Sequence, residues 1–180
     1  VNRINEDHQG NILIATQHGL YHYLAEKQQL SPWAANDEVQ LFAQRDIRDV
    51  MVDDSGLLWL TTRYAGLIKI DMSSSSIQPF ANYVVDNTDF AINRVYSGLN
   101  DKNNRLWLTS ATGLLYKDPD DRVFSRYSLP EVIAGKNITA IAYKDQQLWL
   151  GGHFGLYSLH PQSGRVISQN HLLEKVKTKQ

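Results

Sequence analysis

The sequence repeats one pattern of apolar and polar positions four times, with a period of about 45 residues. Each copy opens with a pair of apolar residues, continues into a polar turn, and then has a compact apolar triplet. Small residues and a Gly-Leu step follow the triplet, and a last apolar segment closes the copy. We assign the four copies to residues 1–46, 47–91, 92–137 and 138–180, with apolar starts at Val1, Ile47, Ile92 and Ile138.

Each copy predicts four short β-strands. The central triplets are Ile12–Ile14, Leu58–Leu60, Leu106–Leu108 and Leu148–Leu150. Such segments are rich in β-branched and aromatic residues and lie between Gly, Asn, Asp and Ser turns, which is typical of strands. We expect the fourth strands at Val39–Gln44, Ile77–Tyr83, Val123–Tyr127 and Val166–Gln169. Only the tail, His171–Gln180, could hold a helical turn.

The repeat also predicts how the strands assemble. A period near 45 residues with four strands per copy is typical of a β-propeller, in which four-stranded antiparallel blades pack face to face around an axis. The predicted fold is therefore all-β, a β-propeller of four blade-like modules. The Gly-Leu steps separate the second and third strands, and we expect their glycines to adopt a positive φ or to allow a close backbone approach. These glycines are Gly19, Gly66, Gly113 and Gly155.

At this level of detail the module resembles the two-component regulator propeller repeat. The second copy matches best, with Val50, the turn Asp53–Gly56, the strand Leu58–Thr62 and then Gly66-Leu67. The fourth copy is close, and the resemblance extends over essentially the whole chain. Three departures stand out: Leu13 where a Trp belongs, Asn103-Asn104 in place of a turn Gly, and Gln146-Gln147 where the fourth turn should carry Gly.

The resemblance implies a place in a larger receptor. In proteins of this family such repeats build large propellers, commonly of seven blades, in the extracytoplasmic part of bacterial sensors. A small β-sandwich, a membrane helix and a cytoplasmic histidine kinase or diguanylate cyclase follow them. The implied role is periplasmic input: sensing a ligand, often a carbohydrate, or holding the geometry of the receptor. The chain starts at Val1 without Met or a leader-like segment, and we expect it to be an excised piece of such a propeller.

A piece of a propeller has two open blade faces that carry apolar area. We therefore expect self-association through these faces. The alternative to a sensing role is a structural or protein-interaction propeller that mediates receptor dimerisation and binds no small molecule.

Composition excludes several classes of partner. The net charge is -1 and no basic block or stripe occurs, so nucleic acid is not an expected partner. The absence of cysteine removes disulfides, thiolate nucleophiles and cysteine-ligated metal sites. No apolar run reaches the roughly 20 residues of a membrane helix, so we expect no membrane insertion by this segment. We expect no cofactor.

Three arginines are candidate ligand-binding residues. Ligand sites of propellers usually lie where the loops between second and third strands meet the starts of the first strands. Arg63 lies in such a loop, whereas Arg48 and Arg94 lie early in first strands. Arg3, Arg48 and Arg94 hold nearly equivalent positions in their copies. A guanidinium group can hold a carboxylate, a sulfate or sugar hydroxyls. The alternative is pairing with nearby carboxylates, namely Asp46, Asp49 or Asp89.

Two aromatic residues and one histidine complete the candidate set. Tyr64 and Phe154 could stack on a sugar face, and the alternative is that they pack between blades. His153 follows two glycines and could contact a ligand or act as an acid or base. The predicted ligand-binding residues are thus Arg48, Arg63, Tyr64, Arg94, His153 and Phe154.

No motif points to metal binding or catalysis. His18 and His22 are four residues apart, but in a strand-turn context they would not share a helix face. The acidic turn Asp118–Asp121 lacks the ligand series of a calcium loop. A nucleophile elbow and a phosphate-binding glycine loop are absent from the sequence. We therefore expect this segment not to be an enzyme, and a propeller hydrolase or lyase, which needs two converging carboxylates, is the remaining alternative.

Overall fold

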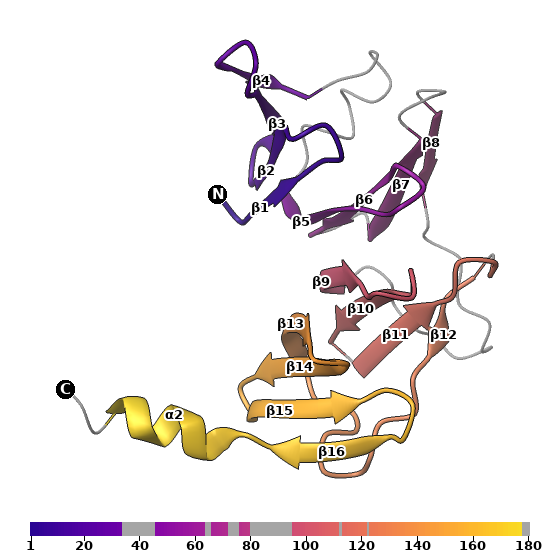
Figure 1. Ribbon diagram of the computed structural model, residues 1–180, viewed down its shortest axis with the longest axis vertical. Coiled ribbons are helices and arrows are strands. Elements are labelled where there is room, and N and C mark those ends of the chain that lie inside the picture. The colour runs from indigo at the N-terminus through magenta and orange to yellow at the C-terminus, as the bar shows by residue number, and fades with distance from the viewer. Residues whose placement is uncertain are drawn as a thin grey trace.

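The computed structural model describes residues 1–33, 46–63, 66–71, 76–79, 95–111, 113–121 and 123–177 (Figure 1). The first sheet contains β1 (Arg3–Glu6), β2 (Ile12–Thr16), β3 (Gly19–Leu24) and β4 (Gln29–Pro32). The second contains β5 (Ile47–Val52), β6 (Leu57–Thr62), β7 (Leu67–Asp71) and β8 (Ser76–Pro79). The third contains β9 (Val95–Asn100), β10 (Leu106–Ser110), β11 (Gly113–Lys117) and β12 (Ser125–Arg126). The fourth contains β13 (Ile138–Lys144), β14 (Gln147–Gly152), β15 (Gly155–His160) and β16 (Arg165–Ser168).

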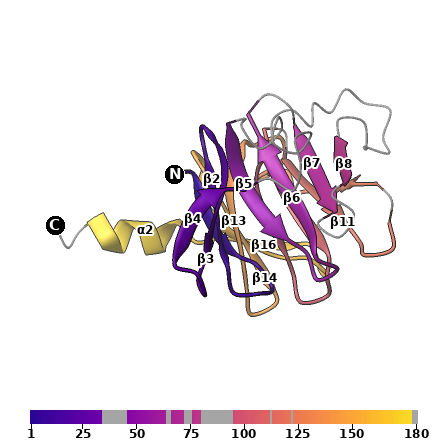
Figure 2. The same cartoon turned by 90° about the horizontal axis from the view of Figure 1, so that it is seen from above.

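The four sheets form the blades of a partial β-propeller, which confirms the predicted fold class. In every sheet the strands are antiparallel and lie side by side in chain order. The first strands of successive sheets contact one another, β1 with β5, β5 with β9 and β9 with β13, while the fourth strands lie outermost (Figure 1). The first strands therefore line the axial side of the arc. One helix, α2 (Asn170–Lys177), forms in the tail where a helical turn was predicted, and it projects from the sheets (Figure 2).

The two faces of a blade pack against different neighbouring blades. We call the face that carries the centre of the second strand, Leu13, Trp59, Trp107 or Trp149, the forward face. The opposite face, which carries Ile14, Leu60, Leu108 or Leu150, is the rear face. In the first core cluster the forward face of blade 1 packs on the rear face of blade 2. The second and third clusters repeat this contact between blades 2 and 3 and between blades 3 and 4.

An aspartate stabilises the turn between the first two strands in blades 2 and 3. Asp53 Oδ1 accepts hydrogen bonds from the backbone N–H groups of Ser55 and Leu57, and its Oδ2 accepts one from Trp59 Nε1 at 2.7 Å. Asp101 makes the same set of bonds in the third blade, including one from Trp107 Nε1 at 2.9 Å. One carboxylate thus caps the turn and fixes the buried indole, which explains the spacing of Asp and Trp in the repeat.

The departures from the repeat pattern have local explanations. Asn104 takes the left-handed conformation, with φ at 59°, in the place of the turn glycine, and asparagine tolerates this conformation better than most residues. The fourth blade has a two-residue turn in which Asp145 and Gln146 both have positive φ, so its geometry differs from that of the other turns. The glycines of the four Gly-Leu steps have positive φ values from 72° to 135°, as predicted.

Two details of the sequence prediction are wrong. The fourth strand of the first blade is Gln29–Pro32, which pairs with β3, and the predicted segment Val39–Gln44 lies outside the described residues. The third blade begins its first strand at Val95 rather than Ile92. Val95 pairs with Ser110 just as Ile47 pairs with Thr62, so the repeat register in this blade shifts by three residues.

A bulge in the first strands also changes which residues are equivalent. Ile47 pairs with Thr62 and Asp49 with Thr61, which leaves Arg48 as the extra residue. The same irregularity leaves Tyr96 in β9 and Thr139 in β13 as the extra residues. Arg3 pairs with Ala15 and so occupies the position of Asp49, not that of Arg48. The expectation that Arg3 and Arg48 hold nearly equivalent positions is therefore wrong, and Arg94 lies outside the described residues.

Candidate functional site

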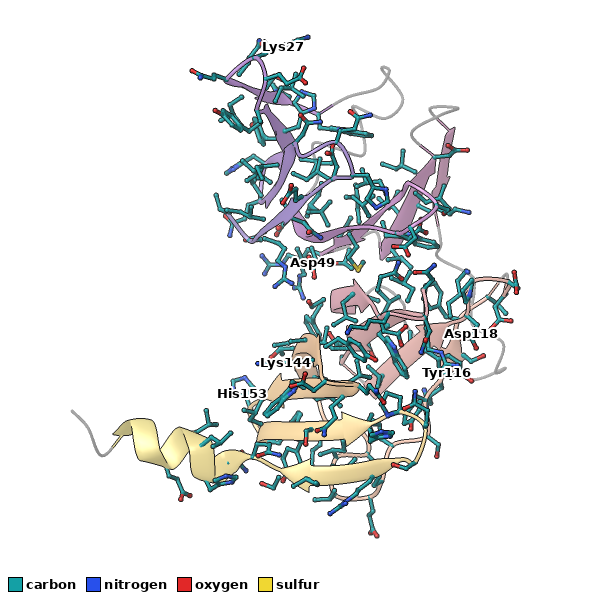
Figure 3. All side chains as sticks on the ribbon, viewed as in Figure 1. Lys27, Asp49, Tyr116, Asp118, Lys144 and His153 are labelled. Carbon is teal, nitrogen blue, oxygen red and sulfur yellow. The ribbon has the colours of Figure 1, made fainter. Side chains whose placement is uncertain are left out.

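A polar network crosses the first strands of three blades on the axial side. Asp49 of β5 is only 2% exposed, and its Oδ2 accepts hydrogen bonds from Ser97 Oγ at 2.6 Å and from the backbone N–H of Gly98 at 3.1 Å. Its Oδ1 accepts the backbone N–H of Val50 at 2.8 Å and lies 3.3 Å from Arg3 Nε. Figure 3 shows Asp49 where the second and third sheets meet. This carboxylate therefore links blades 1, 2 and 3.

Burial dominates the protonation of this carboxyl. Removal from water raises the pKa of Asp49 above its ordinary value, while the hydrogen bond from Ser97 and the charge of Arg3 act in the opposite direction. Arg3, Ser97 and Gly98 belong to the two neighbouring blades, so their contacts hold Asp49 in place between blades. We therefore assign it a structural role at the axis.

An open axial cavity of about 480 Å³ lies beside this network. All four blades contribute to its wall: Arg3 from the first, Asp54 from the second, Asn100 and Lys102 from the third, and Tyr143 from the fourth. The wall residues of blades 3 and 4 come from the ends of β9 and β13 and from the turn after β9. The cavity thus lies toward the turn end of the first strands, opposite to the loops between second and third strands.

Asn100 is the unusual member of this wall. Its amide nitrogen and oxygen are both buried and make no hydrogen bond within the structure. A buried polar group without a partner costs roughly 1–3 kcal/mol. The equivalent positions in the second and fourth blades are Val52 and Tyr143, which pack against apolar clusters. Asn100 is therefore poorly explained by packing, and a water molecule or a ligand group is needed to satisfy it.

The cavity combines apolar surface with polar groups of both charges. Leu99, Ile141 and Ala142 supply apolar atoms, and Tyr143 adds an aromatic ring. Arg3 and Lys102 are cationic and Asp54 and Asp101 are anionic, so the wall has no single strong charge. Such a surface fits a polar, mostly neutral molecule that has both hydroxyl groups and apolar faces.

Both carboxylate oxygens of Asp101 are already used by the turn and by Trp107. Asp101 is therefore held in a structural role and is a poor acid, base or nucleophile. The axial wall does not bring two free carboxylates together among the residues that the structure describes.

Two of the predicted arginines have protein partners. The guanidinium carbon of Arg48 lies 5.0 Å from the centroid of the Tyr96 ring, so two equivalent bulge residues of neighbouring blades contact each other. Arg63 NH1 lies 3.5 Å from Asp46 Oδ2, and the Arg63 backbone N–H donates to the Asp46 carbonyl at 3.0 Å. For Arg63 the structure shows the carboxylate pairing that the sequence left as an alternative.

Of the described candidates, neither the two arginines nor His153 and Phe154 line the axial cavity. His153 is exposed on the loop between β14 and β15, on the fourth sheet and away from Asp49 (Figure 3). Phe154 is half-buried, packs against the third core cluster and lies 5.7 Å from the Tyr157 ring, as the packing alternative expects. Tyr64 and Arg94 lie outside the described residues.

Sequence reasoning missed Asn100 and Tyr143. Both residues hold equivalent positions at the end of their first strands, where the second and first copies have Val52 and Glu6. An amide at a position where two of the other three copies have Val52 and Tyr143 is a recognisable signal. It was hidden because the polar run 100–104 reads as a turn, which assigns Asn100 to the turn and not to the first strand.

The described part of the chain offers neither a metal-binding cluster nor a membrane-spanning helix. No group of three or more His, Asp or Glu side chains that could hold a metal ion occurs among the described residues. None of the helices described is long and apolar enough to cross a membrane.

Sequence comparisons found no relative, whereas structural comparison found several. No family model and no curated protein matches the chain. The extracellular domain of a B. thetaiotaomicron protein described as a hybrid two-component system, BT3049, aligns with a TM-score of 0.70 and 21% identity over 93% of this chain and 24% of that one. That of BT4673 from the same organism, described as a one-component system, has a TM-score of 0.68 and 17% identity over 93% and 24%.

An enzyme shares the same fold. Virginiamycin B lyase from Staphylococcus aureus aligns with a TM-score of 0.63 and 13% identity over 91% of this chain and 53% of that one. These similarities establish the propeller fold, in agreement with the fold that the repeat resemblance implied. The chain spans about a quarter of the length of the two B. thetaiotaomicron domains.

Proposed function

We propose that this chain is part of the ligand-sensing input propeller of a bacterial signal-transduction receptor, located in the periplasm. A histidine kinase or diguanylate cyclase module elsewhere in the polypeptide would provide the output. The repeat resemblance and the structural similarity to extracellular domains of B. thetaiotaomicron signalling proteins support this proposal. The ligand is a polar small molecule, with a carbohydrate as the first class to test.

The unpaired, buried amide of Asn100, a residue of the cavity wall, is the observation that carries the ligand-binding part of the proposal. An amide offers one acceptor and one donor group side by side, and two adjacent hydroxyls of a sugar can match both. The Tyr143 ring in the same wall offers a face for the apolar side of a sugar ring. A catalytic role, as in the lyase, is less well supported because Asp101 is held by the turn.

The first prediction concerns Asn100→Leu, which keeps the side-chain volume and removes the amide. We expect the variant to weaken binding of a saccharide at least about tenfold, which corresponds to 1.4 kcal/mol. We also expect its stability to be unchanged or higher by about 1 kcal/mol, because an unsatisfied polar group is removed. Titration calorimetry with a panel of neutral mono- and oligosaccharides, in parallel with urea unfolding, measures both effects.

Arg48→Ala is the matched control, because Arg48 lies at the other end of the first strands. We expect this variant to bind the same saccharide with unchanged affinity. Loss of binding in Arg48→Ala but not in Asn100→Leu would move the site to the loop end, where the sequence had placed it. Absence of binding to every saccharide and a clear loss of stability in Asn100→Leu would contradict the axial site.

A further inference from the structure

The charged side chains of the axial wall differ in how far the protein itself uses their polar atoms. Asp101 accepts hydrogen bonds from two backbone N–H groups of its turn and from a buried indole N–H, so both of its oxygens are used. Arg3, Lys102 and Asp54 also line the cavity. Within the part of the chain that the structure describes, Lys102 and Asp54 make no side-chain hydrogen bond or ion pair, and Arg3 makes a single contact, with Asp49. The wall therefore holds two cations that can bind a ligand and one such anion.

Arg3 is the better placed of the two cations. It lies in β1, and its Nε is 3.3 Å from Oδ1 of Asp49, a carboxylate that is 2% exposed and hydrogen-bonded to blades 2 and 3. This contact restrains the guanidinium group beside the cavity. The two terminal nitrogens donate no hydrogen bond to any residue that the structure describes, and the side chain is 47% exposed. Arg3 thus offers the cavity an edge of N–H donors that the protein does not use.

A carboxylate is the ligand group that fits this edge. Two parallel N–H donors of a guanidinium group bind both oxygens of one carboxylate, and such a charge-assisted pair is stronger and more directional than a hydrogen bond to a hydroxyl group. Lys102, in the turn after β9, adds a second positive charge to the same wall. Asp54 does not cancel this preference, because a ligand carboxylate can bind at Arg3 without contacting it.

We infer that the saccharide bound in the axial cavity carries a carboxylate and that Arg3 binds this group. The inference rests on the proposed function, because it concerns the ligand of the same cavity. A uronic acid has a carboxylate where the related neutral sugar has a hydroxymethyl group. It keeps the ring hydroxyls and the apolar face that the rest of the wall fits. The ligand class is therefore acidic saccharides, and Arg3 determines the specificity for them.

Pairs of sugars that differ only in this group test the inference. Titration calorimetry at about pH 7, where the carboxylate is ionised, compares glucuronate with glucose, galacturonate with galactose, and the disaccharides of each. Arg3→Gln removes the positive charge, whereas Arg3→Lys keeps the charge and removes the pair of parallel donors. Arg48→Gln is the matched control. It removes the same charge from another first strand, at a residue that stacks on Tyr96 and does not line the cavity.

We expect the wild type to bind a uronate at least about tenfold more tightly than its neutral partner, because hydrogen bonds to a charged group contribute more than those to a neutral one. Arg3→Gln should lose this preference and bind the neutral sugar as the wild type does. Arg3→Lys should keep part of the preference, and Arg48→Gln should keep all of it. Asn100→Leu should weaken the binding of both sugars of a pair by the same factor, because its amide is expected to bind hydroxyl groups that both sugars share.

Salt provides a second measurement if Arg3→Gln fails to fold in urea-unfolding experiments. The preference of the wild type for the uronate should fall when NaCl is raised from about 0.05 M to about 0.5 M, because Arg3 is half-exposed and its charge is screened. A preference that persists in Arg3→Gln, or that does not fall with salt, overturns the inference.

The failure of this inference and that of the proposed function give different results. Equal binding of a uronate and its neutral partner by the wild type overturns the inference alone, provided that Asn100→Leu weakens both. If neither neutral nor acidic saccharides bind, the inference and the proposed saccharide site are both overturned.

Discussion

Replacing Trp107 with alanine should lower the free energy of unfolding by about 3–5 kcal/mol, the largest effect that we expect from a single substitution. Trp107 is 0% exposed and belongs to the cluster between blades 3 and 4. Its ring packs edge to face on Tyr127 at 5.4 Å, and its Nε1 donates to Asp101. Alanine would leave a cavity between blades and would also remove the donor that the Asp101 carboxylate accepts. Urea unfolding followed by circular dichroism measures the change.

Trp149→Ala is the control, because Trp149 holds the equivalent position on the partly exposed forward face of blade 4. We expect it to cost less than half as much as Trp107→Ala. Equal losses in the two variants, or a nearly neutral Trp107→Ala, would contradict the assignment of forward and rear faces.

Replacing Asp49 with alanine should lower the free energy of unfolding by about 3 kcal/mol. The substitution leaves the buried Ser97 hydroxyl and the Gly98 N–H without their acceptor, and each lost partner costs roughly 1–3 kcal/mol. The contact with Arg3 adds little because that side chain is 47% exposed. Arg63→Ala, which removes a surface pair with Asp46, is the control and should cost less than about 1 kcal/mol.

The pH dependence of the same site has a defined sign. Because burial raises the pKa of Asp49 in the folded state, folding favours the protonated carboxyl. The stability of the wild type relative to Asp49→Asn should be greatest below the ordinary pKa of 3.8 and should fall as the pH rises through the raised pKa. Unfolding of both proteins between about pH 3 and pH 7 measures this difference. A difference that grows with pH would show that the hydrogen bonds outweigh burial.

The inner strands of the blades could be predicted from the sequence because specific side-chain hydrogen bonds position them. The Asp that caps a turn and holds a buried Trp leaves a spacing in the sequence, as Asp53 and Trp59 show. The outermost strand has no such signature. β4 is held by its hairpin to β3 and contains one apolar residue, Leu30, so the more apolar segment Val39–Gln44 was the wrong choice.

The axial site was harder to predict because it depends on register between blades. Asp49 and Ser97 are 48 residues apart and meet only when β5 and β9 are aligned correctly. The apolar pair Ile92 and Val95 suggested an alignment three residues away, whereas counting back from Asp101 gives the observed one. The bulge at Arg48 has no signature in the sequence, and for this reason Arg3 and Arg48 looked equivalent.

We propose that this chain is part of a receptor's sensing propeller. The complete reading frame around the chain tests this proposal most directly. We expect further copies of the repeat, then a membrane helix and a histidine kinase or diguanylate cyclase module. A frame that ends near Gln180 and encodes none of these parts would contradict the receptor assignment and leave a self-contained propeller protein.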